Sequence, residues 1–412
     1  MKNYSLLCFA ILFSASMLSA QTNVGLVAHY AFDGNYQDAT GNTANTGVVS
    51  GNPGFRCGVV NDAVLLDGAA DMITIPNGQN VNTEFDTEDF SVSLYFKPIG
   101  TNGQQYLLSK RDTACSYDYD FFAKYVPNSR TVNGLIREIP QKTVSVVHSI
   151  ENTACWQHLV LVRDDFRLKM YVNTQLVSDL GSQTRIDLTS GGDLTIGSAI
   201  CRGPSEVPFH GLIDELRVYN RALDEKEIEG LYFSPDQIVN PDTLIFLGST
   251  IDIELTNTCA DNFFWTPNTL DISSVFIPDP SITPTEQGIY TYTVEMTDLL
   301  SNCTATDSIR INALDPDLLD CETIYLAKAF TPNNDGINDT YGISNPFSVQ
   351  ELISFEIFDR WGNRVFYTTD AFAQWDGRYN GQVTNPGVLL YRVRHVCNQV
   401  ERVATGSVTV LR

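Results

Sequence analysis

The chain has 412 residues, 43% of them apolar, and its 49 acidic residues against 26 basic ones give a formal charge of −23. The apolar fraction excludes a disordered chain, and the length allows two or three domains that each bury a core. The strong negative charge excludes nucleic acid and anionic membranes as partners, because like charges repel.

An apolar run from Leu6 to Leu18 follows Lys2 at the start of the chain, and the small residues Ser19 and Ala20 come next. This pattern is typical of a secretory signal peptide over residues 1–20. The run is too short to remain in a bilayer as a transmembrane helix. We therefore expect an exported protein with no transmembrane segment in the mature chain.

Alternation of apolar and polar residues recurs through residues 22–234. It predicts strands, separated by turns rich in Gly, Asn and Asp, at 89–98, 156–162, 167–172, 194–198 and 212–219. One short helix is expected from Asp224, which can cap its first turn, to Leu231. A β unit of this size suggests two packed sheets in a jelly roll.

Four segments of this unit resemble, in order, the LamG-like jelly rolls of the concanavalin A-like lectin/glucanase superfamily. They are GLVAHYAFDGNYQDATG at 25–41, NDAVLLDGAADMITIP at 61–76, the hairpin at 156–177, and FHGLIDELRVYNRALDEKEIEGLY at 209–232. The hairpin departs from the family pattern at Thr174, where Gly is usual. The resemblance implies that the opening and closing strands come together and that the unit binds glycan or protein.

Residues 239–313 form a smaller predicted unit, in which prolines separate short strands. Its clearest strand is the alternating segment 290–298. The arrangement of Cys259, Trp265 and Cys303 resembles that of PKD-like and Ig-like surface repeats. The resemblance implies a β-sandwich that acts as a spacer, and we call residues 239–313 the middle module.

The most diagnostic pattern lies in residues 320–412. It consists of AFTPNNDGINDTY at 329–341, FEIFDRWGNRVF at 355–366, WDGRYNGQ at 375–382 and GVLLYRVR at 387–394. These segments resemble the gliding-motility-associated C-terminal domain, the type B sorting signal of type IX secretion in Bacteroidota. The resemblance implies passage through the periplasm, recognition by the type IX secretion machinery, and release or retention at the outer-membrane cell surface.

Eight cysteines follow the predicted signal peptide, and each predicted module holds an even number of them. Even numbers are expected if disulfides close within modules in an oxidising compartment. Zinc is the competing interpretation, but no pair has the close Cys-x-x-Cys spacing of zinc sites. The pairing among Cys57, Cys115, Cys155 and Cys201 stays open.

Three aspartates are candidate metal ligands. Asp33 and Asp38 lie in the opening strand and turn, and Asp214 lies in the closing strand. The resemblance brings these two ends together, and Ca²⁺ prefers carboxylate and carbonyl oxygens. We therefore predict a structural Ca²⁺ at these residues. The alternative is that Asp33 and Asp38 are ordinary turn residues and that Asp214 is exposed.

No catalytic residue is assigned. Residues 84–88 (EFDTE) have the E-x-D-x-E spacing of one glucanase family, whose mechanism needs two carboxylates about 5–5.5 Å apart. They precede the strand at 89–98, so we interpret them as a solvated acidic loop. His158 is interpreted as a packed core residue. Aromatic residues near Cys115, including Tyr117 and Tyr119, can stack on sugars, but core or loop packing is the favoured interpretation.

Together these patterns predict an all-β chain with an N-terminal jelly-roll β-sandwich followed by two smaller Ig-like β-sandwich modules. We expect a secreted or surface-displayed adhesin-like protein that is not an enzyme and that binds a glycan or an extracellular protein. One alternative is a secreted glycan-degrading enzyme with a concanavalin A-like fold. Another is a structural surface-layer component without a discrete ligand.

Overall fold

The computed structural model describes residues 23–78, 80–86, 88–112, 114–150, 155–333 and 337–411. The predicted signal peptide, residues 1–20, lies outside these ranges. The described chain is nearly all β, as predicted, and forms two compact units. The first unit is drawn from residues 1–242, 252–282 and 291–309, and the second from residues 243–251, 283–290 and 310–412.

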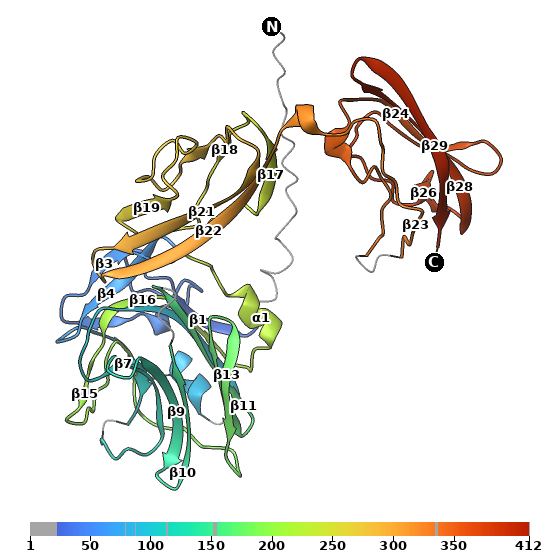
Figure 1. Ribbon diagram of the computed structural model, residues 1–412. Coiled ribbons are helices and arrows are strands. Elements are labelled where there is room, and N and C mark those ends of the chain that lie inside the picture. The colour runs from blue at the N-terminus through green and yellow to red at the C-terminus, as the bar shows by residue number, and fades with distance from the viewer. Residues whose placement is uncertain are drawn as a thin grey trace. The chain divides into compact units, whose positions relative to one another are not determined.

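Two eight-stranded sheets pack face to face as the N-terminal sandwich of the first unit (Figure 1). The first sheet has the order β13-β12-β11-β6-β16-β4-β3, and β1 also pairs with β16. Its strands are β1 (Leu26–Tyr30), β3 (Gly54–Cys57), β4 (Asp62–Asp67), β6 (Phe90–Pro98), β11 (Gln157–Asp164), β12 (Arg167–Val172), β13 (Gln175–Gly181) and β16 (His210–Tyr219).

The second sheet has the order β10-β9-β8-β7-β14-β5-β2, and β15 also pairs with β7. Its strands are β2 (Val48–Ser50), β5 (Met72–Ile75), β7 (Gln104–Lys110), β8 (Asp120–Val126), β9 (Thr131–Ile139), β10 (Lys142–Ser149), β14 (Leu194–Ile196) and β15 (Glu206–Pro208). The five strands expected from alternation correspond to β6, β11, β12, β14 and β16. Antiparallel pairing of β1 with β16 confirms that the opening and closing strands lie side by side.

Aromatic side chains fill the space between the sheets. Phe90 of β6 and Phe121 of β8 come from opposite sheets, and Phe85 comes from the short 3-10 helix η3 (Val81–Phe85). Their ring centroids lie 4.9–5.2 Å apart, and all three are buried. Another 3-10 helix, η2, spans Thr43–Asn45. The alternating apolar residues of both sheets thus share one core.

The predicted short helix is present as α1 (Glu225–Gly230). The Asp224 carboxylate accepts a hydrogen bond from the Glu227 N–H, and the Glu227 carboxylate accepts one from the Asp224 N–H. These reciprocal bonds form a capping box that fixes the first turn. Ile228 and Leu231 are buried and pack with Val160 on the outer face of the first sheet, as the apolar spacing predicted.

The middle module contains β17 (Thr243–Phe246), β18 (Ile251–Asp252), β19 (Asn262–Thr266), β20 (Ser281–Ile282), β21 (Gly288–Asp298) and β22 (Cys303–Leu314). One sheet has the order β17-β22-β21-β19, and β18 pairs with β20. Trp265 is buried and its indole N–H donates to the Ile277 carbonyl over 2.9 Å. The predicted strand at 290–298 is the greater part of β21.

Two disulfides join the jelly roll to the middle module, so the expectation that all disulfides close within modules was wrong. They link Cys57 to Cys259 and Cys155 to Cys303. The other two, Cys115–Cys201 and Cys321–Cys397, do close within their predicted modules. An even number of cysteines per module is compatible with disulfides within modules and with disulfides between modules, because the number alone does not show which cysteines are partners.

A buried ion pair reinforces the same junction. The Lys97 ammonium of β6 pairs with the Asp298 carboxylate at the end of β21, and their side chains are only 2% and 7% exposed. Nearby, the Asn257 amide donates to the carbonyls of Gly58 and Val59 over 3.0 and 2.9 Å. The middle-module residues of the first unit are therefore fixed to the jelly roll, rather than forming a separate spacer.

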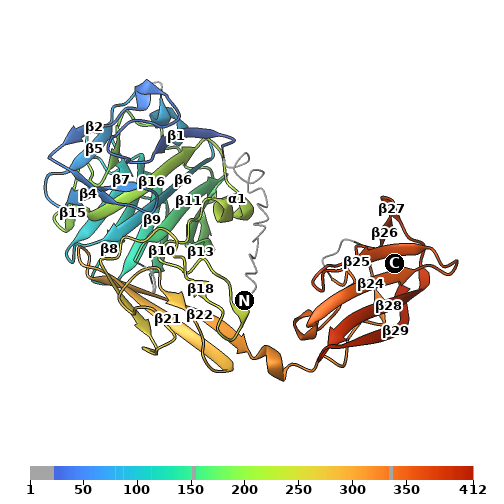
Figure 2. The same ribbon diagram turned by 90° about the horizontal axis from the view of Figure 1, so that it is seen from above.

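The second unit holds a five-stranded sheet with the order β23-β29-β28-β24-β25, whose long strands lie side by side in Figure 2. It contains η4 (Pro316–Leu318), β23 (Ala329–Phe330), η5 (Pro346–Ser348), β24 (Glu351–Phe358), β25 (Arg364–Thr368), β26 (Arg378–Tyr379), β27 (Gln382–Val383), β28 (Gly387–Cys397) and β29 (Val400–Val410). Its core includes Phe355 and Trp375.

Candidate functional site

A pocket of about 440 Å³ opens in the first unit where the jelly roll meets the middle module. Jelly-roll residues line it from the β6–β7 loop, the β8–β9 turn and the start of β11. The opposite wall is the turn between β21 and β22, which contributes Ser301, Asn302 and Cys303. We call this the junction pocket. Its two walls come from parts of the chain about 150 to 200 residues apart.

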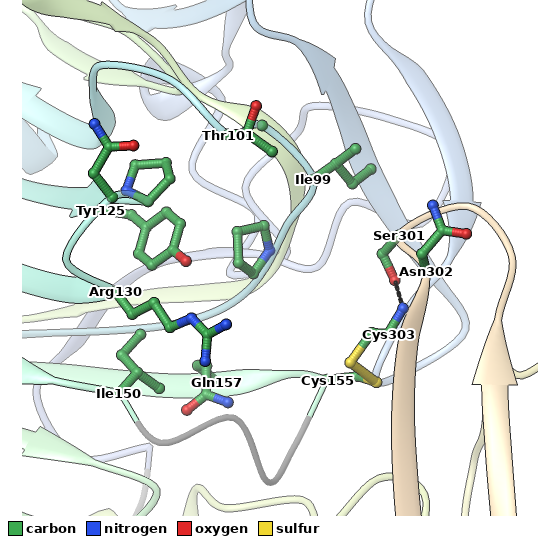
Figure 3. A pocket seen from close by; sticks show the side chains of 14 residues that line it. Ile99, Thr101, Tyr125, Arg130, Ile150, Cys155, Gln157, Ser301, Asn302 and Cys303 are labelled. Atoms are coloured by element: carbon green, nitrogen blue, oxygen red, sulfur yellow. Dashed lines mark hydrogen bonds between the residues drawn. A yellow bond between two sulfur atoms is a disulfide. The ribbon is translucent and has the colours of Figure 1, made fainter.

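Arg130 carries the only charge among the side chains that line the junction pocket in the described chain. Figure 3 shows its side chain extending below the Tyr125 ring, with its guanidinium next to Gln157. Tyr125 is 8% exposed, and burial raises the pKa of its phenol, although the charge of Arg130 opposes that shift. The phenol is therefore neutral and available for hydrogen bonding near the guanidinium.

The other polar lining groups are uncharged. Thr101 and Asn128 are exposed on the jelly-roll loops. The Gln157 side-chain oxygen accepts a hydrogen bond from the Asn173 amide over 3.0 Å, which orients this side chain. The pocket thus combines hydroxyl, amide and guanidinium groups, and its described lining residues include no Asp or Glu. Such a surface can hydrogen-bond a polyhydroxylated ligand but offers no carboxylate pair for acid–base catalysis.

The middle-module wall is held in place by bonds to the jelly roll and by hydrogen bonds within its own turn. The Cys155–Cys303 disulfide ties the end of the turn to the jelly roll (Figure 3). The Asp298 carboxylate accepts hydrogen bonds from the N–H groups of Leu300 and Ser301, over 2.7 and 3.1 Å, while also pairing with Lys97. The pocket is therefore a preformed feature of the first unit.

The structure does not gather the three predicted calcium ligands into one site. Both oxygens of the Asp38 carboxylate accept hydrogen bonds, from the N–H groups of His29 and Thr40, the Thr40 hydroxyl and the Asn45 amide. Asp38 is buried and serves to order its own turn.

Asp33 and Asp214 instead hold opposite sides of the turn that precedes β4. Asp33 accepts from the Asn61 amide and the Asp62 N–H, and Asp214 accepts from the N–H groups of Val59 and Val60. In the described ranges, no cluster of three or more His, Cys, Asp or Glu side chains is arranged to hold a metal ion. The residues present do not fit the predicted Ca²⁺ site, and a calcium requirement stays a prediction.

Asp214 is fully buried, contrary to the alternative that it is exposed. Burial raises the pKa of its carboxyl to about 8, against the effect of its backbone hydrogen bonds, and the adjacent Glu215 raises it further. Gly58 is required beside it, because a Cβ at that position would lie 2.5 Å from the Asp214 carboxylate.

The raised pKa of Asp214 predicts a specific pH dependence. The Asp214 carboxyl keeps its proton in the folded state, whereas in the unfolded chain it releases that proton near pH 4. Its contribution to the free energy of unfolding is therefore fully present below about pH 4. It is lost as the pH rises through about 8. Between pH 6 and 7, we expect the wild type to lose about 1 kcal/mol more unfolding free energy than Asp214→Asn. Chemical denaturation of both proteins at the two pH values measures this difference. Equal losses would contradict it.

The acidic segment at 84–88 belongs to η3 and the following loop, as predicted, and not to a strand on a cleft floor. Glu84 is half-buried, and the Asp86 carbonyl accepts a hydrogen bond from the guanidinium of Arg163 over 2.7 Å. Thr87 lies outside the described residues. This segment therefore has a structural role at the end of the jelly roll.

His158 is a packed core residue, as predicted. It is fully buried, its ring stacks on Tyr95 at 4.5 Å, and its Nε2 lies 2.8 Å from the Ser93 hydroxyl. Burial lowers the pKa of the imidazole to about 3. The ring is therefore neutral and enclosed, which does not suit a catalytic base.

Of the aromatic residues near Cys115, Phe121 and Phe122 are buried, as the favoured interpretation predicted, but Tyr117 and Tyr119 are 44% and 36% exposed. The Arg111 guanidinium lies 4.9 Å from the Tyr117 ring centroid. Of the residues that line the junction pocket, the sequence patterns singled out Cys155 and Cys303 as cysteines, but not Arg130, Ser301 or Asn302. The sequence does indicate a turn at Pro127–Arg130. It does not indicate that this turn faces residues 301–303, because the two segments are too far apart in the chain.

Two family matches agree with the fold of two parts of the chain. Residues 67–229 match the concanavalin A-like lectin/glucanases superfamily, through its Laminin_G_3 model. Residues 324–410 match the CHU_C type IX secretion signal domain. The chain carries a type IX secretion signal. This domain indicates export to the cell surface or the medium. Neither match covers residues 239–313, so the Ig-like assignment of the middle module stays a prediction.

Solved structures with similar folds include domain 4 of AbnA, an extracellular arabinanase from Geobacillus stearothermophilus, in complex with arabinotriose. It has 23% identity and a TM-score of 0.40, and the match covers 50% of this chain and 97% of that one. The Ruminococcus gnavus IT-sialidase CBM40 bound to alpha2,6 sialyllactose has 16% identity, a TM-score of 0.37 and coverages of 41% and 95%. No curated protein matches the chain. In the described residues, every helix is too short or too polar to cross a membrane.

Proposed function

We propose that this protein is an exported, adhesin-like protein that binds a glycan in the junction pocket and is delivered by its type IX secretion signal domain. The observation that carries the proposal is the preformed pocket of hydroxyl, amide and guanidinium groups on a concanavalin A-like domain. The secretion signal supports a role outside the cell, where glycans are abundant ligands. Retention on the cell surface, rather than release, is part of the proposal.

The alternative of a glycan-degrading enzyme has less support. Retaining hydrolysis needs two carboxylates about 5–5.5 Å apart, and inverting hydrolysis needs two at about 6.5–9.5 Å. The described lining of the junction pocket supplies none, and the E-x-D-x-E segment forms a helical turn and loop. Binding without turnover is therefore the function that the geometry supports best.

A glycan array probed with the full-length secreted protein tests the proposal. We expect binding that Thr101→Trp reduces at least about tenfold, because a large side chain at this exposed position fills the pocket entrance. Thr184→Trp, at an exposed position outside the pocket, is the matched control and should bind like the wild type. Absence of binding to every glycan would refute glycan recognition. Binding that survives Thr101→Trp would place the ligand elsewhere.

The same array with Ca²⁺ and then with EDTA tests the calcium prediction. Since the carboxylates of Asp33, Asp38 and Asp214 already accept protein hydrogen bonds, pocket binding should persist in EDTA. Loss of binding on chelation, restored by Ca²⁺, would instead support the predicted metal site.

A further inference from the structure

We propose that the glycan bound by the junction pocket carries a carboxylate, as in a uronic acid or another acidic sugar, and that Arg130 binds this carboxylate. The inference rests on the proposed glycan-binding function and names the class of its ligand.

The Arg130 guanidinium has no hydrogen bond or ion pair with any residue of the described chain. This contrasts with other arginines of the first unit: Arg111 and Arg137 both pair with Asp120, over 2.8 and 2.9 Å, and Arg167 pairs with Asp179. In a chain with 49 acidic residues, a carboxylate is a common neighbour for a cation. An uncommitted guanidinium at a pocket is therefore available to a ligand.

The backbone of Arg130 is fixed in an unusual conformation. Its φ of 51° lies in the left-handed region, which favours Gly over residues that carry a Cβ. The Arg130 N–H donates to the Pro127 carbonyl over 3.1 Å, and the Arg130 carbonyl accepts from the Ile150 N–H over 2.7 Å. These two hydrogen bonds hold the Arg130 backbone at the edge of the junction pocket.

The surroundings of Arg130 select an anionic group with hydroxyls attached. A carboxylate can accept two parallel hydrogen bonds from the planar guanidinium. No carboxylate among the described lining residues competes for it. Thr101, Asn128 and Ser301 can then hydrogen-bond the hydroxyls of the same sugar or its neighbours. The formal net charge of the chain is −23, so most of its surface repels an acidic polymer. The junction pocket, whose only charged lining side chain among the described residues is Arg130, is an exception.

The test compares Arg130→Gln, Arg130→Lys and a matched control, Arg202→Gln, in the full-length secreted protein. Arg202 is exposed on the jelly roll outside the junction pocket, so Arg202→Gln changes the net charge equally. The probes are an array of neutral, carboxylated and sulfated glycans, followed by titration with oligogalacturonate and with its methyl ester. Circular dichroism and thermal unfolding check that each variant folds.

We expect carboxylated glycans to bind, with affinity that falls at high salt. Arg130→Gln should lower this affinity about tenfold or more, and Arg130→Lys should lower it less. Arg202→Gln should leave it unchanged. Oligogalacturonate that binds more tightly than its ester would support the proposal. Binding confined to neutral or sulfated glycans, or carboxylate binding unaffected by Arg130→Gln, would overturn it while leaving glycan binding intact. Binding of no glycan at all would refute both proposals.

Discussion

Asp298→Ala should lower the unfolding free energy of the first unit by about 3–5 kcal/mol. The substitution leaves the Lys97 ammonium buried without its ion-pair partner, over the Trp156 ring with 5.1 Å between the charge and the ring centroid. It also removes the acceptor for the N–H groups of Leu300 and Ser301. Denaturant unfolding followed by tryptophan fluorescence measures the loss.

A double substitution distinguishes the free-energy cost of leaving Lys97 buried without a partner from the net contribution of the ion pair to stability. Lys97→Met combined with Asp298→Leu removes both charges, and replacing a buried ion pair by apolar groups is often neutral. We therefore expect the double variant to be more stable than Asp298→Ala. If Asp298→Ala lowers stability by less than about 1 kcal/mol, the ion pair is not buried in solution. Asp298→Asn, which keeps the hydrogen-bond acceptor, should give an intermediate loss.

The same ion pair predicts a response to acid. Burial favours the protonated form of Asp298, but its bonds to Lys97 and to backbone N–H groups outweigh this effect, and the pKa lies below its usual value. A lowered carboxyl pKa stabilises the folded state above the unfolded-state pKa, and this contribution is lost as the pH falls through the folded value. The Asp298 effect thus acts in the opposite direction to that of Asp214.

Replacing Cys57 and Cys259, or Cys155 and Cys303, by alanine should lower the unfolding free energy of the first unit by about 2–5 kcal/mol for each pair. These disulfides join residues 202 and 148 positions apart, so each restricts the unfolded chain over a long loop. Denaturation of each double variant measures the loss, and protease cleavage of the middle module should become faster.

The matched control is Cys321→Ala with Cys397→Ala, which removes the disulfide inside the second unit. It should not change the stability of the first unit. Mass spectrometry of peptides from the non-reduced protein tests the pairing directly. Recovery of Cys259 linked to Cys303 would contradict the cross-module arrangement and restore the expectation that disulfides close within modules.

The local parts of the fold could be predicted from the sequence. The expected strand at 167–172 is β12, and the expected helix contains Asp224 as its cap and Ile228 on its buried face. Such features depend on residues a few positions apart, which periodicity and capping patterns report directly. The order of family-like segments then predicted the pairing of β1 with β16.

The junction and its pocket could not be predicted in the same way. Cys155 and Cys303 are both in modules with even cysteine counts, so the counts do not show that they are partners. Arg130 and Ser301 line one pocket, but no sequence pattern relates a hairpin turn to a loop about 170 residues later. The structure does not gather the three predicted aspartates into one cluster for a related reason, because hydrogen bonds to nearby turns decide where Asp38 points.

The two cross-module disulfides also determine how the chain carries mechanical load. A pulling force that reaches Cys57 passes through the disulfide directly to Cys259. The chain between these two cysteines, which are 202 positions apart, is therefore not extended by the force. At about 3.5 Å per extended residue, the disulfide prevents about 700 Å of chain from being pulled out. The jelly roll and the junction pocket lie within that shielded stretch, apart from the strands before Cys57 and the turn at Cys303. A bound ligand could therefore be held while neighbouring segments extend.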